Sequence, residues 1–338
     1  MLMQMDALPG PAELADAIRN GNRGLLARAI TLVESQRPRH QQQAQELLQL
    51  LLPQAGAAHR IGVTGVPGVG KSTFLERFGM QLLEHGHRVA VLAVDPSSSL
   101  NGGSILGDKA RMHHLAQHAN AFIRPSPSGN TLGGVARRTR ESMMLCEAAG
   151  FDVVLVETVG VGQSETMVAQ MVDFFLVLML PGAGDELQGI KKGILELADV
   201  IAVNKADGDN QVKARIAVRD YSAALHYLRA RSAHWQPSAM AVSGLEGVGL
   251  DELWQLILQH KIALTGAGEW EQNRAEQRSH WLWEQIEERL LTAFRSNRKV
   301  QAKLSEIEAE VMAQRLPATQ GAMDLLAAFF EADEEASN

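Results

Sequence analysis

Residues 61–72 read IGVTGVPGVGKS, and this stretch decides the class of fold. The short run Ile61–Thr64 leads into Gly65–Ser72, which matches the eight-position pattern G-x-x-x-x-G-K-S/T. The glycines let successive backbone N–H groups turn inward around phosphate oxygens without a clash from a side chain. A helix that starts at the end of such a loop adds partial positive charge at the same place. The stretch therefore predicts a strand, a phosphate-binding loop and a helix, in that order.

Two side chains of the loop have specific roles in this pattern. The Lys71 ammonium is expected to contact the β and γ phosphates of a nucleotide, and the Ser72 hydroxyl is expected to bind Mg²⁺. The plainer alternative is a glycine-rich turn that binds nothing, and the agreement of pattern and context speaks against it. The residues predicted to contact the nucleotide here are Gly65, Val66, Pro67, Gly68, Val69, Gly70, Lys71, Ser72 and Thr73.

Short apolar runs alternate with helical stretches from residue 60 to residue 260. The runs are continuous rather than alternating, as strands of a sheet covered on both faces require. This order predicts an α/β fold with a doubly wound, mostly parallel sheet, whose ligand lies at the carboxyl ends of the strands. The expected strands are Ile61–Thr64, Val89–Val94, Ala121–Ile123, Val153–Val156, Phe174–Leu180, Val200–Val203 and Met240–Val242.

Both ends of the chain are helical in pattern. After residue 268, apolar residues form one helical face over 283–294 and another over 300–311. We expect a helical N-terminal extension of residues 1–58, a P-loop nucleotide-binding domain of residues 59–266 and a helical C-terminal extension of residues 267–338. The apolar faces of the last part exceed what one extension needs to cover, which favours dimerisation through it.

A second motif, NKAD at residues 204–207, follows the apolar run Val200–Val203. The Asp207 carboxylate can accept hydrogen bonds from N1–H and the 2-amino group of guanine, and adenine has no such pair of donors. Charge-assisted bonds of this kind contribute roughly 1.5–3 kcal/mol. An Asn-Lys turn after a strand is common, so its position downstream of the phosphate loop carries the interpretation. Residues 242–244 would bring backbone N–H groups near the guanine O6. The residues predicted to contact guanine are Asn204, Lys205, Asp207, Val242, Ser243 and Gly244.

Carboxylates that follow other apolar runs are candidates for a magnesium site. Glu157 opens the sequence ETVG and occupies the place of the Asp-x-x-Gly motif that senses a γ-phosphate; Asp95 follows Val89–Val94, and Asp108 lies in a glycine-flanked loop. Mg²⁺ prefers oxygen ligands and keeps several waters, so carboxylates near it are expected. Each carboxylate could instead cap a strand end, a loop or a helix. The residues predicted to hold Mg²⁺ are Ser72, Asp95, Asp108 and Glu157.

The polar stretch 181–192, PGAGDELQGIKK, is interpreted as a switch loop that couples the nucleotide state to a partner. It places Lys191 near the phosphates, and with Lys71 and Glu157 this lysine completes the predicted catalytic set. The alternative is an ordinary loop followed by an exposed helical turn. Val161 follows the switch glycine, where Ras-like GTPases carry a glutamine that orients the attacking water, so slow intrinsic hydrolysis is expected.

Composition excludes several classes of protein. A net charge of −7, from 32 basic and 39 acidic side chains, argues against non-specific binding to nucleic acid. The single cysteine, Cys146, excludes a disulfide framework and a Cys-only zinc site, and it fits a reducing cytoplasm. The longest strongly apolar run, Phe174–Leu180, is far shorter than the ~20 residues of a membrane helix, and the N-terminus lacks a signal-peptide pattern. We expect a cytoplasmic protein without a nucleic-acid or membrane partner.

Three segments together resemble one family. Asp95–Ser98, Glu157–Ser164 and Asp185–Lys192 are similar to those of the MeaB/ArgK group, accessory GTPases of adenosylcobalamin-dependent methylmalonyl-CoA mutase. The group belongs to the signal-recognition-like branch of P-loop GTPases, and the resemblance covers nearly the whole chain. It implies a GTP-binding, GTP-hydrolysing chaperone that assists cofactor loading, protection or reactivation of the mutase. It also implies a homodimer formed through the C-terminal helices.

The same resemblance implies roles for single residues. Lys71, Asp95, Asp108 and Glu157 match the residues of the phosphate and magnesium sites in this family, and Lys191 matches its additional switch lysine. The implied ligands are Mg²⁺ and GTP or GDP.

Other functions stay open at this point. A metal-insertion GTPase would need clustered soft or imidazole ligands, and Cys146 alone does not provide them. The family was also described as a kinase linked to basic amino-acid transport. A small-molecule or protein kinase would need a base and a substrate pocket beside the γ-phosphate, and neither is identifiable; the NKAD motif also speaks against ATP. A membrane-targeting GTPase would need an RNA-binding or amphipathic domain, which the sequence lacks.

Overall fold

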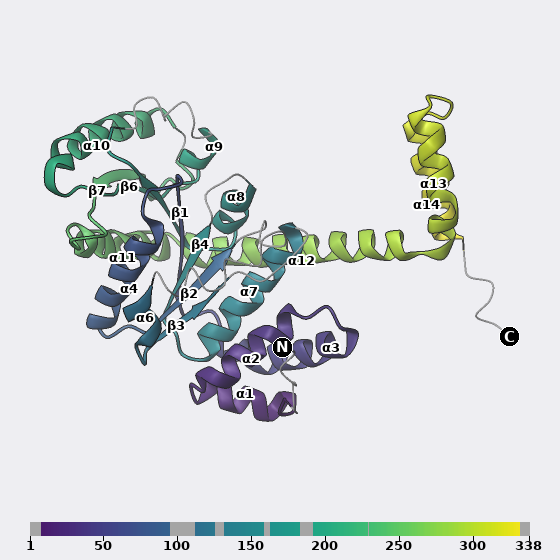
Figure 1. Cartoon of the computed structure of the whole chain (residues 1–338), viewed down its shortest axis with the longest axis horizontal. Helices are drawn as coiled ribbons and strands as arrows, with labels where there is room; N and C mark the ends of the chain where they lie inside the picture. Colours follow the sequence, from purple (N-terminus) through teal and green to yellow (C-terminus); the bar gives the residue numbers. More distant parts are fainter. Residues whose placement is uncertain are drawn as a thin grey trace. The chain divides into compact units, whose positions relative to one another are not determined.

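The computed structural model describes residues 8–94, 112–125, 132–158, 163–182, 192–228 and 230–331. Seven strands form a sheet in the order β3-β2-β4-β1-β5-β6-β7, and each described pair of neighbours is parallel (Figure 1). The doubly wound α/β fold expected from the sequence is confirmed. The strands are β1 (His59–Gly65), β2 (Val89–Val94), β3 (Ala121–Arg124), β4 (Val153–Thr158), β5 (Phe174–Met179), β6 (Val200–Val203) and β7 (Ser238–Ala241).

Helices cover both faces of this sheet. Alternate side chains of a strand point to opposite faces, so Leu155 lies in one apolar core while Val154 and Val156 lie in the other. Each strand is apolar on both faces for this reason, which explains the continuous runs in the sequence. The first core is completed by α4 (Lys71–Glu84), α6 (His113–Gln117) and α11 (Leu250–Gly266). The second is completed by α7 (Leu132–Ala148), α8 (Gln163–Ala169) and α10 (Gln211–His226).

Element boundaries differ slightly from the expected ones. The last strand, β7, ends at Ala241, so Val242 follows the strand instead of belonging to it. Two short helical elements, α9 (Lys192–Leu195) and the 3₁₀ turn η3 (Gly208–Asn210), flank β6 in the chain.

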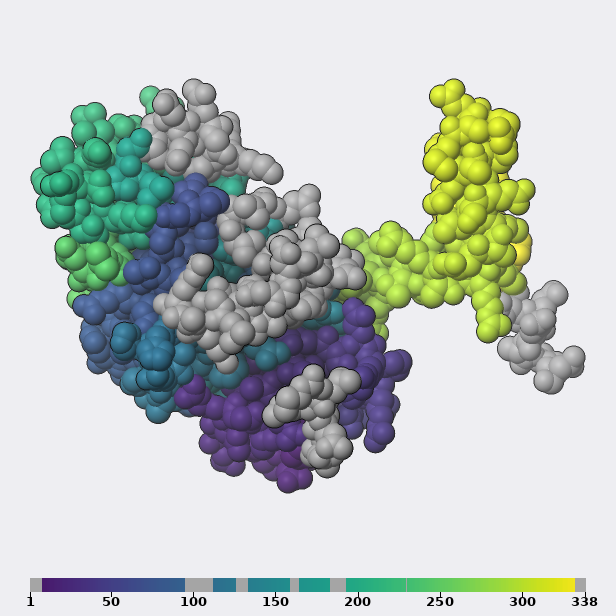
Figure 2. Space-filling model, in the orientation of Figure 1, coloured from purple at the N-terminus to yellow at the C-terminus, as the bar shows by residue number. Residues whose placement is uncertain are grey.

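The N-terminal helices share the second core with the sheet. Arg124 of β3 forms an ion pair with Glu34, and Arg23 donates from Nη1 to the carbonyl of His118 at 3.0 Å. Figure 2 shows the purple surface of these helices lying directly against the teal surface of the sheet domain. These contacts fix the N-terminal helices to the edge of the sheet at β3. The elements are α1 (Pro11–Arg19), α2 (Arg23–Glu34), α3 (Pro38–Leu51) and the 3₁₀ turn η1 (Leu52–Gln54).

A buried ionic network closes the amino edge of the sheet. Arg274 donates from Nε and Nη2 to both carboxylate oxygens of Asp173, at 2.8 and 2.7 Å, and its side chain is 6% exposed. Its Nη2 also donates to the carbonyl of Ala58 at 2.7 Å. Arg60 donates from its backbone N–H to Asp173 at 2.9 Å and from Nε to Glu147 at 2.6 Å. Residues from four distant parts of the chain therefore meet at this edge.

The chain divides into two compact units, residues 1–277 and residues 278–338. In the second unit the rings of Phe294 and Phe329 contact each other at a tilt of 58°, with centroids 5.5 Å apart, and Gly321 leaves room for Ile307. The three-part division expected from the sequence stays a prediction.

Among the described residues, no helix combines the length and apolar character that crossing a membrane demands. The remaining helices are α12 (Glu269–Ser296), α13 (Arg298–Met312) and α14 (Ala318–Phe330).

Candidate nucleotide-binding site

The predicted phosphate loop joins β1 to α4 at the carboxyl edge of the sheet. Gly68 and Gly70 have φ angles of +78° and +90°, which residues with a side chain rarely adopt. Lys71 begins α4, and Ser72 and Thr73 lie in its first turn, the former half-buried and the latter exposed. The loop thus has the left-handed backbone and the following helix that a phosphate cradle requires.

Lys71 lies against this loop. Its Nζ donates to the carbonyl of Gly65 at 2.8 Å. Burial lowers the pKa of the ammonium, and the nearby carboxylates of Glu157 and Glu165 act in the opposite direction. A negative charge strongly stabilises a partly desolvated cation at the N-terminus of a helix, so a phosphate would bind favourably at this position.

Asn204 fastens the NKAD segment to the phosphate loop. Its Nδ2 donates to the carbonyl of Val69 at 2.8 Å, and its Oδ1 accepts from the backbone N–H of Gly244 at 2.9 Å. Lys205, whose φ is +61°, donates from Nζ to the carbonyl of Gly68 at 2.8 Å. Two consecutive side chains thereby set the spacing between the phosphate loop and the predicted guanine site.

Asp207 has one carboxylate oxygen held within the protein. The Ser243 hydroxyl donates to Asp207 Oδ2 at 2.5 Å, and Ser243 Oγ accepts the backbone N–H of Glu246 at 3.0 Å. The serine hydrogen is therefore directed at the carboxylate. Val242 and Ser243 are fully buried directly after β7, and the backbone N–H of Ala206 donates to the carbonyl of Val242 at 3.0 Å, so this segment lies beside the NKAD segment. The carboxylate that would accept the two guanine donors is held by a partner 36 residues away.

Glu157 lies near the end of β4, paired in register with Val63 of β1 and Ala93 of β2. It is 9% exposed, and its negative charge acts to raise the pKa of Lys71 against the larger effect of burial. With the Ser72 hydroxyl it offers the oxygen donors that Mg²⁺ prefers. Within the described ranges no group of three or more His, Cys, Asp or Glu could hold a metal ion. A magnesium ion here would need further ligands such as phosphates and waters, as it commonly takes in nucleotide sites.

Three predicted residues, Asp95, Asp108 and Lys191, lie outside the described residues. The switch residues Gly160 and Val161 do so as well. Their roles stay predictions from the sequence.

Cys146 bears on the metal-insertion alternative. It lies fully buried in α7, and burial raises the pKa of its thiol. A thiol that stays protonated and inaccessible is not a metal ligand, because the thiolate is the binding form.

Sequence reasoning did not single out Thr64 and Thr158. Thr158 Oγ1 donates to Thr64 Oγ1 at 2.7 Å within the buried sheet. A signal was available, since Thr64 ends the run directly before the phosphate loop and Thr158 follows Glu157 in the predicted switch segment. The hydrogen bond between Ser243 and Asp207 was missed too, because it depends on which strands are neighbours.

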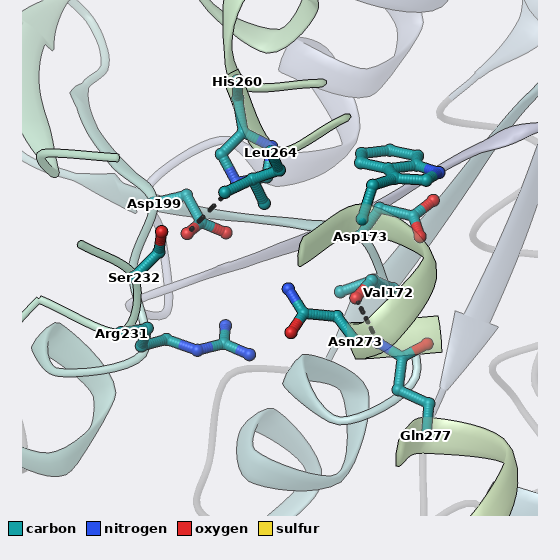
Figure 3. A pocket seen from close by; sticks show the side chains of 10 residues that line it. Val172, Asp173, Asp199, Arg231, Ser232, His260, Leu264, Asn273 and Gln277 are labelled. Atoms are coloured by element: carbon teal, nitrogen blue, oxygen red, sulfur yellow. Dashed lines mark hydrogen bonds and ion pairs between the residues drawn. The ribbon is translucent and has the colours of Figure 1, made fainter. Parts of the chain in front are cut away.

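The amino edge of the sheet contains a pocket of about 70 Å³ (Figure 3). The Nε2 of His260 lies 3.8 Å from Oδ1 of Asp199, and Gln277 donates from Nε2 to the carbonyl of Val172 at 2.8 Å. Burial raises the pKa of Asp199 and lowers that of His260, so both shifts favour the neutral forms. Ligands of doubly wound sheets bind at the carboxyl ends of the strands, and this pocket lies at the other end. It is therefore not the nucleotide site.

Known proteins resemble the chain along most of its length. A family model described as "Methylmalonyl Co-A mutase-associated GTPase MeaB" matches residues 26–299. The "GTPase ArgK" of Escherichia coli is 54% identical over 286 residues, which cover 85% of this chain and 86% of that protein. The "Methylmalonic aciduria type A homolog, mitochondrial" of Mus musculus is 45% identical over 319 residues, covering 91% of this chain and 77% of that protein.

A solved structure described as an "LAO/AO transport system kinase" superimposes with a TM-score of 0.77 at 44% identity. The match covers 95% of this chain and 99% of that one. The similarity to this solved structure, in fold and in sequence, therefore extends over the sheet and over both helical ends of the chain.

Proposed function

This chain belongs to the MeaB family of methylmalonyl-CoA mutase-associated GTPases, and on that premise we propose that it is a GTP-dependent chaperone of adenosylcobalamin-dependent methylmalonyl-CoA mutase. The chain is a GTPase, and the mutase is the proposed partner. Cofactor loading, protection and reactivation are the forms of assistance that the resemblance implies.

The observation that carries the nucleotide part of the proposal is the joining of two motifs. Asn204 and Lys205 hold the carbonyls of Val69 and Gly68, so the guanine-reading segment is fastened to the phosphate-binding loop. Asp207, on the same segment, is held by Ser243. A nucleotide bound with its phosphates in the loop would find its base beside a fixed carboxylate, which favours guanine over adenine.

Several residues of this chain have separate roles in the proposed hydrolysis of GTP. Lys71 binds the β and γ phosphates and offsets the negative charge that develops on them. Ser72 and Glu157, with Asp95 and Asp108 from the sequence prediction, would hold Mg²⁺ or its waters. When bound, the ion would neutralise part of the negative charge on the phosphates. Lys191 is proposed as a further cation that acts at the site when a partner binds.

The second unit supports a homodimer. Large apolar side chains of α12, α13 and α14 are exposed to solvent in the single chain, and exposed apolar surface can mark an interaction site. The face over 300–311 expected to dimerise is partly covered within the unit, because Ile307 packs on Gly321 of α14. The exposed side chains are Leu282, Trp283, Leu290, Leu291, Met312, Met323, Leu326 and Phe330.

Single-turnover GTP hydrolysis with and without the mutase tests the proposed partner. We expect the mutase to accelerate hydrolysis ~10²-fold, or about 2.7 kcal/mol of barrier, with the Lys191→Ala variant losing that acceleration and keeping its affinity for GTP. Lys192→Ala is the matched control, since it removes the neighbouring charge. A rate unchanged by the mutase contradicts the partner, and full acceleration of the Lys191→Ala variant contradicts the role of that lysine.

A further inference from the structure

Two hydroxyl groups at the carboxyl edge of the sheet have no part in the function described so far. Thr158 Oγ1 donates to Thr64 Oγ1 at 2.7 Å. Thr64 is 1% exposed and Thr158 is 0% exposed. Bulk water does not reach this bond, because both side chains are buried in the sheet.

The pair lies in a row otherwise made of valines. The register of the sheet sets Val94 of β2 beside Thr158, and Val177 of β5 beside Thr64. Both valines belong to the apolar core on this face. Threonine and valine have nearly the same shape, so valine would fill either position.

Stability alone does not explain two hydroxyls in this row. A buried hydroxyl is unfavourable unless it is hydrogen-bonded, and replacing both partners of a buried bond with apolar groups of the same shape is nearly neutral or stabilising. Four valines would therefore pack here at least as well. What the hydroxyls add is a directional bond between β4 and β1.

That bond lies where the pairing between β1 and β4 ends. Val63 and Glu157 are the last residues paired in register between β1 and β4. The hydroxyl bond continues the connection by one residue, to Thr64 and Thr158. Gly65 of the phosphate loop follows Thr64 directly, and Glu157 precedes Thr158.

We propose that Thr158 and Thr64 are a positioning pair for GTP hydrolysis, which fixes the Glu157 carboxylate relative to Lys71 and the phosphate loop. The inference rests on the proposed function of the site. The pair acts through its neighbours in the chain and is not itself a catalytic group. Misplacing a carboxylate by a fraction of an ångström lowers the rate of a reaction far more than it lowers ground-state binding.

The test compares Thr158→Val with Thr158→Ser, which keeps the hydroxyl, in the full-length protein. Single-turnover hydrolysis at saturating GTP and Mg²⁺ is expected to slow ~10-fold in the valine variant and less than about twofold in the serine variant. The GDP dissociation constant is expected to stay within about twofold in both variants. Thr64→Val and the double valine variant should slow hydrolysis to the same degree as Thr158→Val, because the two hydroxyls act as one unit.

A matched control is Thr139→Val, since Thr139 is also buried and donates to a backbone carbonyl, that of Val135, at 2.9 Å. Its hydrolysis rate is expected to stay at the original value. If Thr158→Val does not fold, the double valine variant decides, because it removes both hydroxyls of the pair and leaves neither without the other. Hydrolysis at the original rate in the folded valine variants overturns the inference. No GTP turnover by the unmodified protein refutes the proposed function itself, and the role of the pair with it.

Discussion

Exchanging Asp207 for asparagine is expected to change the base specificity of the site from guanine to xanthine. The Ser243 hydroxyl donates to Asp207 Oδ2 at 2.5 Å, and its oxygen accepts the backbone N–H of Glu246 at 3.0 Å. In the Asp207→Asn variant the side-chain carbonyl would accept from Ser243, and the amide NH₂ would face the base. That NH₂ opposes the two donors of guanine and matches the C2 oxygen of xanthine.

The magnitude follows from the hydrogen bonds that are lost. Two charge-assisted bonds at roughly 1.5 kcal/mol each, the low end because Asp207 is half-buried, amount to about 3 kcal/mol. The dissociation constant for GDP should therefore rise ~10²-fold, while that for xanthosine diphosphate should fall. Titration calorimetry with GDP, ADP and xanthosine diphosphate measures all three affinities on one protein.

Two further variants make the test specific. Asp209→Asn removes an exposed carboxylate two residues away and is expected to leave GDP affinity unchanged. Adding Ser243→Ala to the Asp207→Asn variant frees the amide to rotate and should weaken its preference for xanthine. GDP affinity within threefold of the original in the Asp207→Asn variant, or equal affinity of the unmodified protein for ADP and GDP, would refute the guanine assignment.

Three other outcomes are expected. The Glu157→Ala variant should bind GDP normally and hydrolyse GTP slowly at limiting Mg²⁺; an original rate under these conditions contradicts its place near the metal. His59 is 6% exposed between Trp254 and Trp270, and burial lowers its pKa to about 4. This pKa is below the value of 6.5 for an unfolded chain, so protons bind His59 in the unfolded state first as the pH falls. The contribution of neutral His59 to the free energy of unfolding is therefore present above pH 6.5 and is lost as the pH falls to 4. About 2 kcal/mol of the free energy of unfolding should be lost between pH 7 and pH 5. Urea unfolding should show this loss in the unmodified protein and a smaller one in His59→Phe, and equal losses would contradict it. Light scattering should give a dimer for the unmodified protein and a monomer for Leu290→Asp, and a monomeric unmodified protein would contradict the homodimer.

The class of fold could be predicted from the sequence because its signals are local. The continuous apolar runs and the stretch Gly65–Ser72 each depend on residues that are neighbours in the chain. The glycines at positions 68 and 70 indicate a left-handed backbone whatever the tertiary structure of the rest of the chain. The place of the NKAD segment after a buried strand was readable for the same reason.

What could not be predicted depends on the order of the strands. β1 lies between β4 and β5, and only this order brings Thr64 beside Thr158. The bond from Ser243 to Asp207 likewise needs β6 and β7 to be neighbours. The partial cover of the apolar face over 300–311 by α14 could not be predicted either, because periodicity does not show which side chains another helix of the same chain covers.

The ionic network at the amino edge of the sheet also bears on how the chain is made. Asp173 precedes Arg274 by 101 residues, so Asp173 leaves the ribosome long before Arg274 does. Until Arg274 emerges, a buried Asp173 would lack its main countercharge, and removing one partner of such a pair typically costs about 3–5 kcal/mol. The sheet can therefore reach its full stability only when the first turns of α12 have been synthesised. A shortened chain that stops at residue 266 should fold poorly, whereas one that stops after Gln277 keeps the whole network.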